Sequence, residues 1–143
     1  MSSELEFAYL DSSVILRVIL DEPAQLKEFR QVKQGVSSQI TKLECMRTLD
    51  RLRHSASATD MEFAELFTIF HKIYMKLILV PVSHSMIDRA SQPVGFALKS
   101  LDALHLASCQ AFQIAHNCRL PLLTHNNKLG FVARAVGIDV MGV

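Results

Sequence analysis

An α/β fold with a central parallel sheet is the architecture that this sequence predicts, and three observations lead to it. Short apolar runs alternate with longer amphipathic segments along the 143 residues, which is the order that strands joined by crossover helices produce. The run at residues 77–82 is apolar throughout, as expected for a strand covered by helices on both faces. The 5 Gly and 4 Pro residues are scattered, so no linker is indicated, and residues 1–143 are expected to form a single domain.

The first two strands are expected early in the chain. Residues 6–10 form an apolar run that predicts a strand, and a second apolar run predicts a helix over residues 12–20. A proline in its first turn suits another helix over residues 23–33. Gly35 is expected to end that helix, which leaves residues 36–38 as a short second strand.

Two long helices and a third strand are expected in the middle of the chain. A helix over residues 41–54 is followed by a polar turn at residues 55–59. Thr59 and Glu62 have the spacing of a capping box, so the next helix is expected to begin there and to end near residue 76. The apolar run at residues 77–82 then forms the strand.

The last part of the chain is expected to contain three helices and two strands. Ser83 begins a short helix, and a loop leads to a long helix over residues 101–116. The buried side of that long helix is expected to consist of Leu101, Leu104, Ala111, Phe112 and Ala115. A strand, a helix capped by Gly137 and a final strand are expected at residues 120–124, 126–136 and 138–141.

Composition and charge exclude several classes of protein. Half of the residues are hydrophobic and a fifth are charged, which supports a packed core and argues against disorder. The net charge of +1 gives no overall attraction to nucleic acid, so RNA binding would need a local basic patch. The 3 cysteines form no Cys-x-x-Cys pair, which disfavours a disulfide framework or a zinc site. Cys45 and Cys109 are expected to be buried apolar side chains.

No membrane attachment is expected. The chain begins with an acidic segment that does not resemble a secretory signal. The longest apolar run, at residues 77–82, is far shorter than the ~20 residues that span a bilayer. A cytoplasmic protein is therefore expected.

Asp11 is the first candidate site residue, because it directly follows the first expected strand. The carboxyl end of a strand in a parallel sheet is where such folds build their sites. Asp before a helix is also a common N-cap, although Ser12 or Ser13 could cap this helix instead.

Two further acids lie on expected helices. Glu44 follows Ile40 by one turn and lies on or beside an apolar stripe, where a carboxylate needs a metal or a partner such as Arg47 or Lys42. Asp102 lies in a first helical turn, where the helix dipole alone favours an acid. His105 follows Asp102 by one turn and is expected to be a hydrogen-bonded histidine at the edge of the core.

Thr124 and Asn126 follow the strand expected at residues 120–124, where a turn with a helix cap is the simpler interpretation. If these segments converge at one edge of the sheet, the clustered carboxylates repel one another unless a divalent cation neutralises them. Hard oxygen ligands favour Mg²⁺ or Mn²⁺, and such an ion can activate water for phosphodiester cleavage.

The motifs that carry these residues resemble the PIN domain family, and more closely the VapC-type toxins of bacterial and archaeal toxin–antitoxin pairs. The resemblance covers nearly the whole chain, in order and with the right spacing, and implies a three-layer α/β/α sandwich with a central parallel sheet of four to five strands. Its motifs are Tyr9-Leu10-Asp11-Ser12-Ser13, residues 38–49 with Glu44, Leu101-Asp102-Ala103-Leu104-His105-Leu106-Ala107, and Leu123-Thr124-His125-Asn126.

The resemblance implies a Mg²⁺-dependent endoribonuclease, with Mn²⁺ as the other ion that fits. Asp11, Glu44 and Asp102 take the places of the family's acids, and Ser12 and Thr124 those of its hydroxyl residues. Asp11 and Asp102 would hold the metal, with Glu44 as a further ligand or as the residue that orients the attacking water. The family often has a fourth acid where this chain has Asn126, which puts a second metal in doubt.

The resemblance also implies partners: an RNA substrate, a cognate antitoxin protein and a second copy in a homodimer. Basic residues that could contact RNA are Arg47, Arg51, Arg53, Lys99 and Lys128. Apolar residues that could contact the antitoxin or the second copy are Leu26, Phe29, Phe63, Phe67 and Phe70. Core packing explains at least half of these apolar residues equally well.

Two other enzyme classes also place an Asp after a first strand, and the sequence disfavours both. A haloacid-dehalogenase-type phosphatase needs a second Asp where this chain has Ser13. A receiver domain needs a phosphoacceptor Asp on a later strand and a Lys after another strand, and neither is in place. The remaining alternative is a PIN-fold module that has lost robust catalysis and binds RNA or a protein partner, which Asn126 keeps open.

Overall fold

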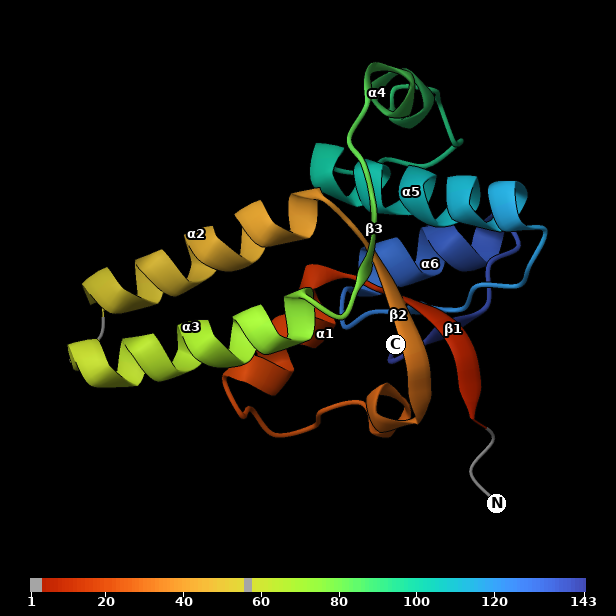
Figure 1. Cartoon of the computed structure of the whole chain (residues 1–143). Helices are drawn as coiled ribbons and strands as arrows, with labels where there is room; N and C mark the ends of the chain where they lie inside the picture. The colour runs from red at the N-terminus through yellow and green to blue at the C-terminus, as the bar shows by residue number, and fades with distance from the viewer. Residues whose placement is uncertain (1–3, 56–57) are drawn as a thin grey trace.

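The structure is a computed structural model that describes residues 4–55 and 58–143. Its described part contains one parallel sheet of five strands in the order β3-β2-β1-β4-β5 (Figure 1). The central strand β1 (Leu5–Leu10) pairs with β2 (Val32–Ser38) and with β4 (Leu122–Leu123). The edge strands are β3 (Ile78–Val80) and β5 (Val140–Met141). The predicted parallel sheet is therefore confirmed.

Side chains of β1 alternate between two cores, one on each face of the sheet. Tyr9 is buried in one core with residues of the helices α4 (His84–Ala90), α5 (Ser100–His116) and α6 (Asn127–Ala135). Ala8 and Leu10 are buried in the other core, with residues of α1 (Ser12–Ile19), α2 (Ile40–Ser55) and α3 (Asp60–Tyr74). The result is the three-layer sandwich that the sequence predicted. In Figure 1, α2 and α3 lie side by side and extend away from the sheet.

The prediction of a helix over residues 23–33 is wrong. The chain instead forms a short 3-10 helix, η1 (Lys27–Gln31), and β2 already begins at Val32. Asp21 and Ala24 have positive φ angles of 49° and 62°, which an α-helix does not accept, so the helical pattern is interrupted on both sides of Pro23.

Gly35 was expected to end a helix, but it lies inside β2. A Cβ atom at this position would stand 2.7 Å from Leu77 Cδ2 and 3.0 Å from Leu10 Cδ1. The glycine therefore lets neighbouring side chains pack closely against the strand.

The third strand is shorter and more exposed than the sequence suggested. It covers three residues at the edge of the sheet, and Ile78 is 40% exposed, so the apolar run is not covered on both faces. The expectation for α5 was also partly wrong. Leu101, which is 42% exposed, and Ala115 lie on its exposed side, whereas Leu104 and Phe112 are buried as expected.

Caps begin the helices where the sequence placed them. Thr59 and Glu62 form both hydrogen bonds of a capping box at the start of α3, and Ser83 caps α4. Residues 56 and 57 of the expected polar turn, and the N-terminal residues 1–3, lie outside the described residues. Cys45 and Cys109 are buried, as predicted. No helix in the described ranges combines the length and the apolar character that a bilayer crossing requires.

Candidate active site

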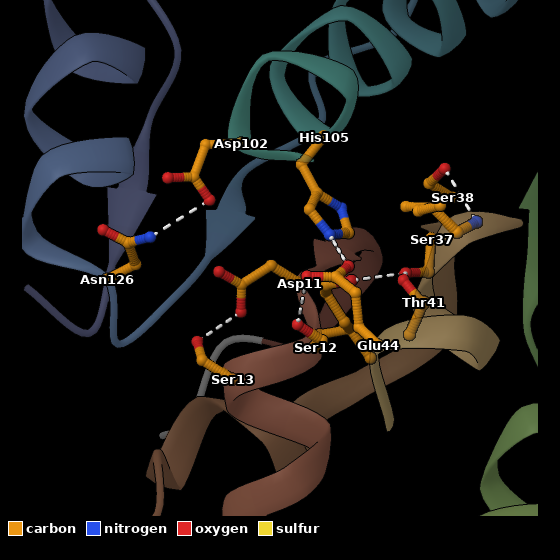
Figure 2. Close-up of polar contacts among 12 residues, drawn as sticks. Asp11, Ser12, Ser13, Ser37, Ser38, Thr41, Glu44, Asp102, His105 and Asn126 are labelled. Atoms are coloured by element: carbon orange, nitrogen blue, oxygen red, sulfur yellow. Dashed lines mark hydrogen bonds and ion pairs between the residues drawn. The ribbon is translucent and has the colours of Figure 1, made fainter. Parts of the chain in front are cut away.

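The candidate residues Asp11, Glu44, Asp102, Thr124 and Asn126 come from four segments and meet near the carboxyl ends of β1, β2 and β4. Asp11 follows β1, and Thr124 follows β4. Glu44 lies on α2, in the turn after Ile40, and Asp102 lies in the first turn of α5. Figure 2 shows the three carboxylates and Asn126 directed toward one region.

Asp11 is buried, with 4% of its surface exposed, and its carboxylate accepts three hydrogen bonds. Oδ1 accepts from the backbone N–H of Val14, which caps α1, and from the hydroxyl of Ser13. Oδ2 accepts from Thr124 Oγ1 at 2.5 Å. Asp11 therefore caps the helix and also faces the site, and the two serines that could have replaced it as the cap have other roles.

Glu44 is held by a hydrogen-bonded chain that begins in the core. The Tyr9 hydroxyl is completely buried, and burial raises the pKa of Tyr9 well above its ordinary value, so the hydroxyl keeps its proton. It lies 2.7 Å from His105 Nδ1, and His105 Nε2 lies 2.5 Å from Glu44 Oε1. A carboxylate only accepts hydrogen bonds, so His105 Nε2 carries a proton that it donates to Glu44, and in the neutral ring Nδ1 then accepts from the Tyr9 hydroxyl. Ser12 donates to Glu44 Oε2 at 3.1 Å.

The partners that the sequence suggested for Glu44 are engaged elsewhere. Arg47 pairs with Asp50 at 2.9 Å, and the Lys42 ammonium lies 6.0 Å from the centre of the Tyr74 ring. His105 is the hydrogen-bonded histidine that the sequence predicted, but its link to Glu44 and to Tyr9 was not foreseen. The only local signal for Tyr9 was its position two residues before Asp11, which directs both side chains to the same face of a strand.

Asp102 is held differently, by one neutral amide. Asn126 caps α6 by accepting from the backbone N–H of Leu129 with Oδ1, and this leaves its NH₂ group to donate to Asp102 Oδ1 at 3.1 Å. The orientation of the amide is therefore fixed, because Leu129 requires an acceptor. The Asn126 carbonyl oxygen accepts one hydrogen bond from its own helix and keeps a second lone pair, so it can still offer a neutral oxygen to a metal or a water.

The charges of the three carboxylates act on one another. Burial raises the pKa of Asp102 above its ordinary value, the hydrogen bond from Asn126 and the charge of His105 oppose this shift, and the charges of Asp11 and Glu44 add to it. Burial also raises the pKa of the Cys45 thiol to about 12, again with contributions from Glu44 and Asp11. The site is thus a region of negative potential in which ionised Asp102 is disfavoured.

This donor set fits a hard, hydrated cation. Within residues 4–55 and 58–143, no three His, Cys, Asp or Glu side chains are grouped closely enough to enclose a metal ion. Mg²⁺ is commonly bound by one or two carboxylates and keeps several of its waters, so it does not need such a cage. Oxygen donors and an unbalanced negative charge are what such an ion requires.

An open groove of about 680 Å³ passes over these residues. Its lining combines acids, two lysines and apolar side chains: Glu44, Ala97, Leu98, Lys99, Ser100, Leu101, Asp102, Asn126 and Lys128. Of the predicted basic residues, Lys99 and Lys128 thus lie beside the acids. The three arginines of α2 do not line the groove, and Arg53 instead pairs with Asp60 at 3.0 Å.

Fold and motifs together define the class of protein. Residues 8–135 match the model of the PIN domain family, and this protein belongs to that family, as its motifs predicted. The chain is 28% identical over 136 residues to Ribonuclease VapC46 of Mycobacterium tuberculosis, which covers 93% of this chain and 95% of that protein. This likeness agrees with the narrower resemblance to VapC-type toxins.

Two solved structures share the fold at low sequence identity. PAE2754 from Pyrobaculum aerophilum superposes with a TM-score of 0.59 at 15% identity, over 95% of this chain and 89% of that chain. A member of the VapBC family of toxin–antitoxin systems, VapBC-5 from Mycobacterium tuberculosis, superposes with a TM-score of 0.59 at 18% identity, over 96% and 98% of the two chains.

Proposed function

We propose that this protein is a divalent-metal-dependent endoribonuclease that acts as the toxin of a toxin–antitoxin pair. The observation that carries the proposal is the convergence of Asp11, Glu44 and Asp102 on one edge of a PIN sheet, where Glu44 and Asp102 line a groove that also contains two lysines. Ribonuclease VapC46, a relative that aligns with nearly the whole chain, supports RNA as the substrate.

Asp11 and Asp102 would hold Mg²⁺ or Mn²⁺, with Glu44 as a further ligand or as the residue that orients the attacking water. When bound, the ion supplies positive charge that neutralises the site and activates water. The chain's own residues do the rest. Glu44, fixed by His105 and Ser12, orients the attacking water and accepts its proton, while Thr124 holds Asp11 in place.

The reaction is the hydrolysis of an RNA phosphodiester. Water attacks phosphorus, the bond from phosphorus to the 3′ oxygen breaks, and the products are a 3′ hydroxyl and a 5′ phosphate. Lys99 and Lys128 contact neighbouring phosphates, which makes binding dependent on salt concentration. Asn126 holds Asp102 through its NH₂ group and adds no charge to the site, which is consistent with a single metal ion.

The proposed partners are a cognate antitoxin and a second copy of this chain in a homodimer, in the cytoplasm, with no membrane attachment. The fold shared with VapBC-5, a toxin–antitoxin family member, supports the antitoxin. Of the apolar residues predicted for these contacts, Phe67 is 45% exposed, whereas Phe70 is buried in the core and is excluded. Leu26, Phe29 and Phe63 are only partly buried against the core.

The test is cleavage of a mixed cellular RNA pool by the purified chain with Mg²⁺, with Mn²⁺ and with EDTA, beside the Asp11→Asn variant. Asn at this position still caps α1, so the variant should fold while losing cleavage. Cleavage that requires both metal and Asp11 supports the proposal. Full activity of the variant with metal dependence retained would contradict the assigned site.

One observation favours a second candidate function, a PIN-fold module that binds RNA or protein without robust catalysis. Asn126 replaces an acid with an amide whose NH₂ group faces Asp102. If a folded sample free of partner cleaves no RNA with either metal, this second function replaces the first. RNA binding by the same sample then distinguishes an RNA-binding module from a protein-binding one.

A further inference from the structure

Two exposed phenylalanines form a pair that the sequence did not reveal. Phe96, in the loop before α5, is 41% exposed, and Phe131, on α6, is 55% exposed. Their ring centres lie 5.4 Å apart with an angle of 89° between the ring planes. Edge-to-face packing of this kind fixes both rings while large parts of their surfaces remain open to solvent.

The pair is adjacent to the groove that contains the acids. Phe96 lines a neighbouring pocket, which shares Ala97 and Leu98 with the groove. Phe131 follows Lys128 by three residues on α6, so the two side chains lie on the same side of that helix. Each aromatic ring therefore has a groove lysine close to it along the chain.

The lysines are available to an anion from outside the chain. Among the residues that the structure describes, no acidic side chain forms an ion pair with Lys99 or Lys128. Asp102, which lies in the same groove, is held by Asn126. Aromatic faces beside unpaired ammonium groups match the two parts of a nucleotide, its base and its phosphate.

We propose that Phe96, Phe131, Lys99 and Lys128 form a subsite for an unpaired nucleotide of single-stranded RNA, beside the phosphate that is cleaved. The inference rests on the proposed ribonuclease function and names the form of RNA that the site accepts. The base stacks on the exposed Phe face and the lysines contact its phosphates. A duplex is disfavoured because its bases are stacked on one another and present no free face.

Charge favours RNA over a second copy of this chain at this surface. A two-fold interface places the same surface of both copies together, and here it would bring the lysines of one copy near those of the other. The repulsion between these like charges is relieved by phosphate groups.

The test measures binding of a fluorescently labelled short RNA, single-stranded or annealed to its complement, by fluorescence anisotropy in EDTA. All variants carry Asp11→Asn, so binding is measured without cleavage. We expect Phe131→Ala and Phe96→Ala to weaken single-strand binding about tenfold and to leave duplex binding unchanged. Phe131→Trp keeps a stacking face and should retain binding, whereas Phe131→Leu keeps only apolar bulk and should not.

Phe67→Ala is the matched control, because Phe67 is 45% exposed but lies on α3 and does not line the groove. It should leave binding of both RNAs unchanged. Lys128→Ala should weaken binding of both RNAs. It should also reduce the slope of log affinity against log salt concentration by about one. Thermal melts of each variant confirm that the chain is folded.

Two results would overturn the proposal. One is single-strand affinity in Phe131→Ala and Phe96→Ala equal to that of the parent. The other is a lower molecular mass of these variants in sedimentation, together with equal losses of affinity for single-stranded and duplex RNA. That result would assign Phe96 and Phe131 to contacts between two copies of the chain. Because cleavage is absent from the assay, Phe-dependent single-strand binding stands even if the ribonuclease proposal fails. If the parent chain cleaves RNA but the Phe variants bind RNA as well as the parent does, the subsite proposal is refuted and the ribonuclease proposal stands.

Discussion

Glu44 and Asp102 belong to the same site but are held in opposite ways. Glu44 accepts from His105 and Ser12, and the histidine is fixed in turn by the buried Tyr9 hydroxyl. Asp102 has one neutral donor, and its pKa is raised above the ordinary value, by burial first. Glu44 therefore has hydrogen bonds that its amide would weaken, whereas Asp102 has a burial cost as an anion that its amide would remove. Replacing each with its amide should therefore change activity in the same direction and stability in opposite directions.

The largest effect is expected for Glu44→Gln. Loss of the group that orients water and accepts its proton should lower the cleavage rate by about 10²- to 10⁴-fold. The variant also loses hydrogen bonds to an ionised acceptor, each worth roughly 1.5–3 kcal/mol, so its free energy of unfolding should fall. Single-turnover cleavage and urea denaturation measure the two effects. Unchanged stability would show that the link through His105 does not hold Glu44.

Asp102→Asn should also lower the cleavage rate but raise stability at neutral pH. The pKa of Asp102 is higher in the folded than in the unfolded chain, so the folded state binds the proton more tightly. Its stability is therefore greatest at low pH and falls as pH rises from the ordinary value of about 3.9 through the raised pKa. The variant has no such dependence. Urea denaturation from about pH 4 to pH 7 should show the difference between the two proteins growing with pH. A variant that is less stable than the parent at pH 7 contradicts the comparison.

A smaller effect is expected for Tyr9→Phe, which removes the hydroxyl that fixes the His105 tautomer. Loss of such an indirect hydrogen bond commonly lowers activity by about 10- to 100-fold, and here kcat should fall while KM stays the same. The buried Nδ1 left without a donor should lower stability by roughly 1–3 kcal/mol. Nitrogen-15 NMR of the imidazole reports the tautomer directly. Tyr74→Phe, at the chain's other tyrosine, is the control and should leave the His105 spectrum unchanged.

The smallest effect on the isolated chain is expected for Asn126→Asp. Asp caps α6 as well as Asn does, but it replaces the donor to Asp102 with a second negative charge. Repulsion between these partly exposed carboxylates should lower stability by about 1 kcal/mol without metal. Mg²⁺ should restore it, with a larger rise in melting temperature than in the parent. A variant that Mg²⁺ stabilises no more than the parent would show that this position does not contribute to metal binding.

Local patterns predicted most of the fold because the rules that form helices and strands act over a few residues. The apolar run before Asp11, the capping box at Thr59 and the cap at Asn126 all appear where the sequence placed them. The helix expected at residues 23–33 does not form, because positive φ angles at Asp21 and Ala24 change the direction of the chain. An alanine in the sequence gives no indication of a positive φ angle. The exposure of Ile78 depends on the strand's place at the edge of the sheet, which no local pattern records.

The sequence by itself determined which acids are the candidates for the site: Asp11 by its place after a strand, and Glu44 and Asp102 as acids at the edges of apolar helical stripes. The tertiary structure alone decided how they are used. Tyr9 reaches His105 across 96 residues of sequence, His105 reaches Glu44 across 61, and Asn126 turns its NH₂ group to Asp102 because Leu129 takes its oxygen. Phe96 and Phe131 meet only because α6 packs beside α5. Charge and the spacing of apolar residues are properties of short segments. Hydrogen-bond partners that are distant in sequence, and contacts between exposed side chains such as the two phenylalanines, depend on the order of strands in the sheet.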